Sequence, residues 1–161
     1  MLARAASLSE RRSLAREAPA LGVLLLLGAA AISGFTLLRE LYPYDEGQIL
    51  LAARRVAQGE WPYADFVFPY GPGQPLLLGS LEDLFGPSLL WWRLVRVCAD
   101  AVVAVVVFVL VRREAPLAVA LVAWLIAAAA MAQPGGSNPF AVAIALGLCA
   151  FGVATAKPPG A

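Results

Sequence analysis

Residues 88-SLLWWRLVRVCADAVVAVVVFVLV-111 form a long, mostly apolar run that is followed by Arg112 and Arg113. A helix of this length, at about 1.5 Å per residue, crosses the roughly 30 Å hydrocarbon core of a bilayer. The run opens with Trp91 and Trp92, and aromatic side chains suit the membrane–water interface. We therefore predict that residues 88–111 form a transmembrane helix.

Three further apolar runs flank this segment, at residues 20–38, 116–132 and 140–156. Of the 161 residues, 61% are hydrophobic and 14% are charged, against about 45–50% and about 25% in soluble domains. Such an excess of apolar side chains is too large for one small core. We expect an all-α integral membrane protein with about four transmembrane helices, in which the short run at 116–132 is completed by its flanks.

The first run has a second interpretation. Arginines precede it, and residues 29–31 are alanines of the kind found near a signal-peptide cleavage site. We favour a transmembrane helix, because the apolar run continues to Leu38 and further spanning segments follow.

The charges between the runs predict the orientation of the chain. With four spans, the basic tail (residues 1–19), Arg112 and Arg113, and the end at 157–161 lie on one side. Because cytoplasmic segments are enriched in Lys and Arg, we expect that side to be the cytoplasmic side of the cell membrane. The loop at 39–87 then lies outside, and its seven carboxylates and three arginines give it a formal charge of −4.

Composition also restricts the chemistry. The net charge is +1 and no basic stripe occurs, so we expect no nucleic-acid partner. Cys98 and Cys149 lie inside apolar runs, where buried thiols are expected rather than a disulfide. The chain has no histidine, so any catalysis must use carboxylates and any metal must be held by oxygen ligands.

The long extracytoplasmic loop contains two helical patterns. Residues 47–57 place apolar side chains at helical spacing, and Gly59 ends the pattern. Residues 61–75 hold four prolines and cannot form a regular helix. Residues 76–85 form a second short pattern that stops at Gly86. We expect two short helices at the membrane surface.

The acidic pair Asp45 and Glu46 directly precedes the first of these helices. Asp45 fits a helix N-cap with Gln48 at the third position, as in a capping box. Glu46 fits a first-turn complement to the helix dipole. A divalent cation between the two is a further alternative, although two carboxylates are too few oxygen ligands to assign one.

These features follow one another in the order found in a known group of enzymes. After the acidic pair and the helix come G-x-x-P-Y-x-D-F (59–66), P-G-Q-P (72–75) and F-G-P-S-L-L-x-x-R (85–93). From Ala20 to Arg113 the chain resembles the GT-C superfamily of glycosyltransferases, within it the protein-O-mannosyltransferase and aminoarabinose-transferase-like branch. Members of that superfamily have many more spans, so we expect this chain to be an N-terminal part of an enzyme or one part of an assembly.

The resemblance implies an inverting transfer of a sugar from a polyprenyl-phosphate donor to an acceptor on the outer side, with no cofactor required. Asp45 matches the acidic residue that faces the donor phosphate and the acceptor, and Glu46 matches the second acidic position. Arg93 or Arg96 matches an arginine that binds the carrier phosphate. General chemistry agrees, because such a transfer needs a base at the membrane surface and this chain offers only carboxylates.

Structural alternatives exist for several of these side chains. Arg93, Arg96 and Asp100 form one stripe at i, i+3 and i+7, and charges at this depth usually face a protein interior. Their alternative role is interfacial snorkelling with an Arg96–Asp100 ion pair. Asp65 could bind the acceptor or instead cap the Pro-rich turn.

The remaining polar and aromatic residues of the loop have ordinary surface roles as our first expectation. Arg54 and Arg55 would contact lipid headgroups, and Glu82 and Asp83 would form a solvated helix face. The aromatic residues are expected to be interface anchors; they are Trp61, Tyr63, Phe66, Phe68 and Tyr70.

Two rival functions belong to different classes. A non-catalytic membrane subunit would pack against a partner through its Ala-rich spans, because small residues permit close helix contact. A transporter fragment would use Arg93, Arg96 and Asp100, but the repeat symmetry that favours such a fold is absent from the sequence.

Overall fold

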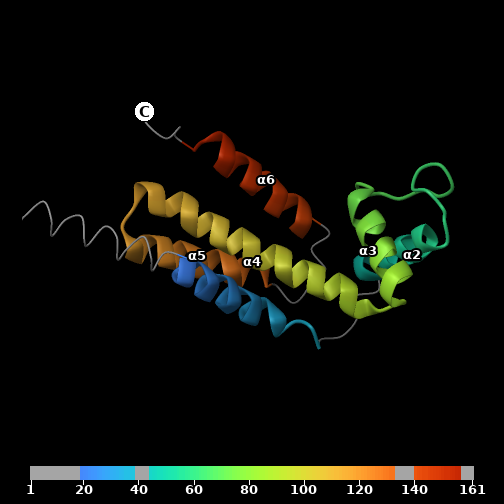
Figure 1. Ribbon diagram of the computed structural model, residues 1–161, viewed down its shortest axis with the longest axis horizontal. Coiled ribbons are helices and arrows are strands. Elements are labelled where there is room, and N and C mark those ends of the chain that lie inside the picture. The colour runs from blue at the N-terminus through green and yellow to red at the C-terminus, as the bar shows by residue number, and fades with distance from the viewer. Residues whose placement is uncertain (1–18, 39–43, 133–139, 157–161) are drawn as a thin grey trace, which may run out of the picture.

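The computed structural model describes residues 19–38, 44–132 and 140–156, which form six helices (Figure 1). The expected all-α class is confirmed within these ranges. Residues 1–18 of the basic tail, the 133–139 connection and the basic end at 157–161 lie outside them. The helices are Pro19–Gly34, α2 (Asp45–Ala57), α3 (Gly73–Phe85), α4 (Leu89–Glu114), α5 (Leu117–Met131) and α6 (Ala141–Ala154).

The central element is α4. Ser88 caps its N-terminus, because the Ser88 Oγ accepts a hydrogen bond from the Leu90 N–H at 3.1 Å. The helix ends just before Pro116, whose ring disfavours helical backbone in the preceding residue. α5 and α6 both pack against α4, and the N-terminal helix runs beside α4 and α5 (Figure 1).

Small residues bring the helices of this bundle close together. Ala29 of the N-terminal helix meets α4 and α5 in a cluster of buried alanines, and a second cluster joins α4 to α6. Such residues allow close backbone approach without large interlocking side chains. The buried members of the two clusters are Ala29, Ala101, Ala104 and Ala128, then Ala99, Val103, Ala141 and Ala145.

α2 and α3 form a separate lobe at one end of the bundle (Figure 1), which we call the α2–α3 lobe. Gly79 lies at its closest contact: a Cβ added there would lie 2.8 Å from the Val56 Cβ and 2.9 Å from the Ala53 carbonyl oxygen. The backbone of α3 at Gly79 therefore packs directly against the backbone and side chains of α2, with no room for a larger residue. The lobe's buried core consists of Ile49, Ala52, Ala53, Phe66, Phe68, Leu78 and Trp92.

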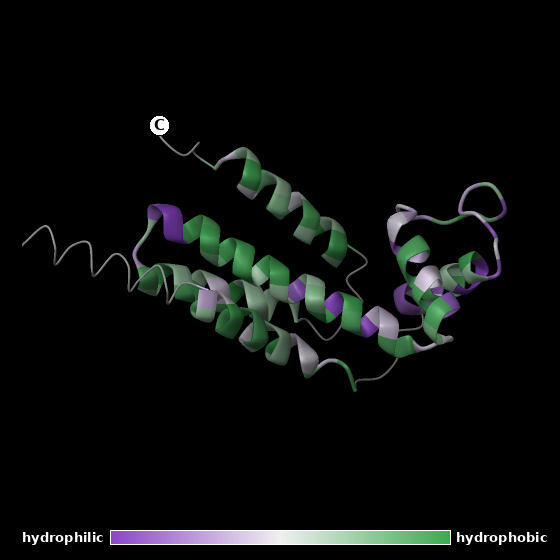
Figure 2. Ribbon diagram, viewed as in Figure 1, coloured by the Kyte–Doolittle hydropathy of each residue, from purple (hydrophilic) through white to green (hydrophobic). Residues whose placement is uncertain are grey.

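Among the described helices, only α4, with 26 residues, is long and apolar enough to cross a membrane. The other three apolar helices, Pro19–Gly34, α5 and α6, are shorter, and α5 and α6 have 15 and 14 residues. One candidate span is therefore present, and the other three predicted spans stay predictions. Most residues of these four helices are hydrophobic (Figure 2). The hydrophilic residues of α4 lie in the half nearest the α2–α3 lobe and at the opposite end of the helix.

Both loop helices begin earlier than the sequence pattern predicts. α2 starts at Asp45, two residues before the predicted start. α3 starts at Gly73, so the expectation that residues 61–75 exclude regular helix is wrong for the last three. Pro75 is tolerated there, because it lies in the first turn, where backbone N–H groups have no partner within the helix.

Candidate functional site

Asp45 is the first residue of α2, and its half-buried carboxylate is bound by a tyrosine from the loop. The Tyr70 hydroxyl donates a hydrogen bond to the Asp45 Oδ1 at 2.8 Å. The Tyr70 ring packs edge-on against Phe68 and Phe140, with both centroid distances at 5.7 Å. This contact brings α2, the loop before α3 and the residue before α6 to one place.

The capping-box interpretation of Asp45 is wrong. The N-cap is Tyr44, without a side-chain cap, and the Gln48 N–H is bonded to the Tyr44 carbonyl at 3.1 Å. Tyr70, rather than the amides of α2, therefore orients the Asp45 carboxylate. The hydrogen bond to Asp45 raises the pKa of the Tyr70 phenol, with further contributions from desolvation and from the charge of Asp45.

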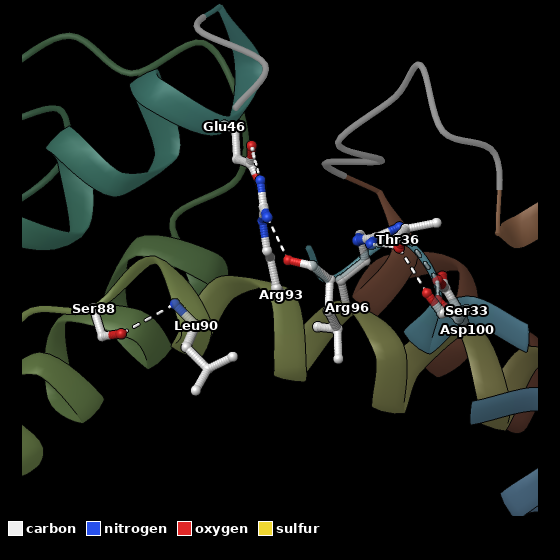
Figure 3. Close-up of polar contacts among 9 residues, drawn as sticks. Ser33, Thr36, Glu46, Ser88, Leu90, Arg93, Arg96 and Asp100 are labelled. Atoms are coloured by element: carbon white, nitrogen blue, oxygen red, sulfur yellow. Dashed lines mark hydrogen bonds and ion pairs between the residues drawn. The ribbon is translucent and has the colours of Figure 1, made fainter. Parts of the chain in front are cut away.

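Glu46 and Arg93, two of the predicted site residues, form an ion pair between α2 and α4 (Figure 3). The Arg93 Nε donates to the Glu46 Oε1 at 2.9 Å, and Nη2 donates to Oε2 at 3.3 Å, which is the two-pronged geometry that suits Arg and carboxylate. The two residues are only 5% and 6% exposed. Arg93 also donates through Nη1 to the Leu37 carbonyl, so one guanidinium joins three segments of the chain.

A second polar group lies one turn further along α4 (Figure 3). Arg96 donates to the Thr36 Oγ1, and its Nη1 lies 3.7 Å from the Asp100 Oδ2, which confirms the predicted i, i+4 pair. The Ser33 hydroxyl donates to the same Asp100 oxygen at 2.6 Å. All four side chains are buried, so Arg96 does not snorkel toward a surface. The other Asp100 oxygen has no hydrogen-bond partner among the described residues.

Asp65 lies apart from these groups, in the exposed turn between α2 and α3. Its Oδ2 accepts a hydrogen bond from the Trp61 N–H at 2.7 Å, and its carbonyl accepts one from Arg55 at 3.1 Å. Tyr63 in the same turn has a φ of 68°, a left-handed conformation that needs such local support. Asp65 thus caps the turn, as one of the two interpretations expects, and a contact with the acceptor stays a prediction.

A cleft of about 190 Å³ lies beside Tyr70, with the start of α3 on one side and α6 on the other. Gln74 on its α3 side is buried, and its Nε2 has no partner in the ranges that the structure describes. Tyr70 borders the cleft and also binds Asp45. The Tyr70 side chain therefore lies between the cleft and the Asp45 carboxylate. The lining residues are Tyr70, Gly71, Gly73, Gln74, Phe140, Val142, Ala143 and Leu146.

The two neighbouring carboxylates do not converge on one point. Asp45 contacts Tyr70 and Glu46 contacts Arg93, so they turn toward different partners. In the described part of the chain, no group of three or more acidic or thiol side chains lies together in a way that could hold a metal. The divalent-cation alternative therefore has no third carboxylate or thiolate ligand within these residues.

The sequence does not single out several residues that the structure places at these contacts. Ser33 and Thr36 carry a usable signal, because they lie at i, i+3 in an apolar run, the same spacing as Arg93 and Arg96. The local sequence around Tyr70 gives no such signal. Its partner Asp45 lies 25 residues away, and a tyrosine that anchors a membrane interface would have the same neighbours in sequence.

The expectation of a solvated face at Glu82 and Asp83 is wrong for Glu82. Asp83 is exposed, but Glu82 is only 8% exposed, because it lies on the side of α3 that faces inward. A short helical pattern with two adjacent carboxylates does not reveal which of them points inward.

Comparison with known proteins identifies no relative. No protein-family model, no curated protein and no solved structure matches this chain. The resemblance to the GT-C superfamily therefore stays a prediction.

Proposed function

We propose that this chain is part of a multi-span membrane glycosyltransferase that moves a sugar from a polyprenyl-phosphate donor to an acceptor at the extracytoplasmic surface. Asp45 is the catalytic carboxylate of this proposal, and Tyr70 positions it. The proposal is carried by one observation: the 2.8 Å contact between Tyr70 and Asp45, at the end of an apolar bundle and beside a cleft of about 190 Å³.

Membrane embedding is supported by the apolar side chains on the outside of the bundle. Leu27 on the N-terminal helix, Ile126 on α5 and Leu146 on α6 are each at least 60% exposed. Helices of soluble proteins usually carry polar side chains on such outward faces. Lipid covers these side chains in the proposed setting, and local thinning of the bilayer accommodates the shorter helices.

The proposed reaction is a single displacement at the anomeric carbon of the sugar. The Asp45 carboxylate takes the proton of the acceptor hydroxyl, and the acceptor oxygen forms a bond to the anomeric carbon. The bond between that carbon and the phosphate oxygen breaks, and its electron pair leaves on the polyprenyl phosphate. Attack from the opposite face inverts the configuration, and a positioned base of this kind contributes roughly 10²–10⁴-fold to the rate.

The hydrogen bond from Tyr70 suits Asp45 to this role. It occupies Oδ1 and fixes the direction of the carboxylate, and the described residues make no hydrogen bond to Oδ2. The second oxygen is thus the one that accepts the proton. The lipid carrier presents its phosphate at the membrane surface, and the α2–α3 lobe at the end of the bundle lies at that level in the proposed orientation.

Arg93 is the phosphate ligand of this proposal only after an exchange of partners. Its Nε and Nη2 groups contact the Glu46 carboxylate, and a phosphate offers the same pair of acceptor oxygens. The donor phosphate therefore takes the place of Glu46 on Arg93. Arg96 keeps its contacts with Thr36 and Asp100 and so holds α4 against the segment that follows the N-terminal helix.

The test is sugar transfer in membranes of the native host, in which any partner subunit is present. A panel of radiolabelled polyprenyl-phosphate hexoses and pentoses is supplied, and Asp45→Asn is compared with the unaltered protein at equal abundance. We expect transfer to fall by roughly 10²-fold or more. Asp83→Asn, the same change at an exposed carboxylate, is the matched control, and equal transfer by all three proteins would overturn the assignment.

A second candidate is a non-catalytic membrane subunit. It is favoured by the Glu46–Arg93 pair, which is buried and saturated by protein groups, as a structural contact would be. The alanine clusters are consistent with the same role. This candidate predicts that Asp45→Asn leaves the biological function of the assembly intact, whereas the enzyme predicts its loss.

A further inference from the structure

A larger cleft, of about 550 Å³, opens where α2, α3 and the start of α4 meet. It is distinct from the cleft beside Tyr70 and shares none of its lining residues. Its walls combine both signs of charge with apolar surface. The lining includes Arg54, Glu82 and Ser88 as polar groups and Leu50, Leu51 and Leu89 as apolar groups.

Glu82 is the unusual member of this lining. It is more than nine-tenths buried, yet its carboxylate forms no hydrogen bond or ion pair with the described residues. Arg55 also lines the cleft, but its guanidinium is engaged by Glu60 at 2.5 Å and by the carbonyl of Asp65. A recessed carboxylate without a cation is unfavourable, and the Glu82 oxygens are not among the fully enclosed polar atoms. The cleft is therefore built to receive a cationic group at Glu82.

The opposite charge has a place in the same cleft. Arg54 is exposed and has no hydrogen-bond or ion-pair partner within the described ranges. Ser88 stands at the N-terminus of α4, a helix of 26 residues with no acidic side chain in its first turn. A guanidinium and a helix N-terminus both favour a phosphate.

We propose that this cleft binds an aminoalkyl phosphate, the chemistry of an ethanolamine phospholipid headgroup. The primary amine lies on Glu82, and the phosphate lies between Arg54 and the start of α4. The leucines of the lining contact the glycerol and the first acyl carbons. The site goes beyond sugar transfer and uses none of the residues assigned to it, so either proposal can fail alone.

Binding is measured by native mass spectrometry on the full chain, purified in a maltoside detergent. The probes are short-chain diacyl phosphatidylethanolamine, phosphatidylcholine, which lacks amine N–H donors, and phosphatidylglycerol, which lacks the cation. We expect the ethanolamine lipid to bind about tenfold more tightly than the other two, as suits one charge-assisted hydrogen bond. Equal binding of all three lipids would overturn the proposal.

Two variants separate the charges. Glu82→Gln should abolish the preference for the ethanolamine lipid, and Arg54→Gln should weaken all three lipids alike. Asp83→Asn, beside Glu82 but exposed, should behave as the unaltered chain. A preference that survives Glu82→Gln contradicts the assignment of the amine.

Two further measurements complete the test. One distinguishes a free headgroup from a bilayer lipid, and the other probes Glu82 without a substitution. Displacement of the lipid by soluble phosphoethanolamine supports recognition of the headgroup alone, whereas failure of the soluble compound beside tight lipid binding supports a bilayer lipid held also by the leucines. In the unaltered chain, carbodiimide coupling at Glu82 should be slowed several-fold by the ethanolamine lipid. Coupling that is unchanged by the lipid would sink the proposal even if Glu82→Gln does not fold.

Discussion

Two adjacent carboxylates in α2 have different surroundings, and helix geometry explains the difference. Successive residues of an α-helix point about 100° apart, so Asp45 and Glu46 cannot share one face. Asp45 meets the Tyr70 phenol at the edge of the lobe, and Glu46 meets Arg93 inside the structure. We therefore expect substitutions at the two positions to have separable effects, on transfer at Asp45 and on stability at Glu46.

Removal of the Glu46 charge should destabilise the fold, because Arg93 would remain buried opposite a neutral group. For Glu46→Gln we expect a loss of roughly 3–5 kcal/mol in the free energy of unfolding, as for other buried pairs that lose one partner. Denaturant titration in detergent measures it. The double variant Glu46→Gln/Arg93→Met should recover most of the loss, and additive losses would contradict a direct pair.

The Tyr70–Asp45 contact should have a signature at alkaline pH. Its hydrogen bond raises the pKa of the Tyr70 phenol, so the contact stabilises the fold fully below the ordinary tyrosine pKa of about 10. The stabilisation is lost as the pH rises through the raised value. Ultraviolet titration should show one late-titrating tyrosine that shifts to lower pH in Asp45→Asn; the control Asp83→Asn should leave the titration curve unchanged.

Among the helices, α2 and α3 make a close contact in the last turn of α2. Gly79 makes this contact possible, because any Cβ there would meet Val56 and the backbone of Ala53. The sequence pattern predicts two short loop helices but gives no hint that they touch. A glycine inside a helical pattern does not by itself indicate a close helix contact. The position of α2 beside Gly79 shows that this is its role here.

Gly79→Ala should therefore separate α2 from α3. We expect a loss of about 1–3 kcal/mol in the free energy of unfolding, from overpacking of a close contact. Trypsin cleavage at Arg54 and Arg55 should become faster. Gly47→Ala, where nothing lies within 4 Å of the added Cβ, is the control and should be neutral or slightly stabilising; similar losses in both variants would contradict a specific contact.

At the level of the whole molecule, the positions of the apolar helices and of the two short loop helices were predictable from the sequence, but the packing of the loop helices into one lobe was not. Apolar runs and Pro- and Gly-rich breaks indicate where the helices lie, because both depend on local composition. The candidate site was only partly predictable. Arg93 and Glu46 could be named as polar groups near the membrane, but their mutual contact spans 47 residues and depends on how α2 packs against α4.

The proposed orientation is testable by labelling in intact cells. In a variant that carries Cys98→Ala and Cys149→Ala, single cysteines are placed at the exposed Gln58 and Thr155, at the two ends of the molecule. A membrane-impermeant maleimide should label position 58 in intact cells and position 155 only after permeabilisation. The reverse pattern would place Asp45 in the cytosol and end the proposal of an outer active site.

The hydrogen bond from Ser33 to the buried Asp100 bears on how the protein is made. During synthesis the N-terminal helix leaves the ribosome first, well before the charged half of α4. In the proposed membrane setting, Arg96 and Asp100 are poorly suited to lipid on their own, so α4 would gain by leaving the translocon directly against the N-terminal helix and the turn after it, which offer the hydroxyls of Ser33 and Thr36. Membrane insertion of this chain should then be sequential, with the N-terminal helix in place first and α4 inserting against it.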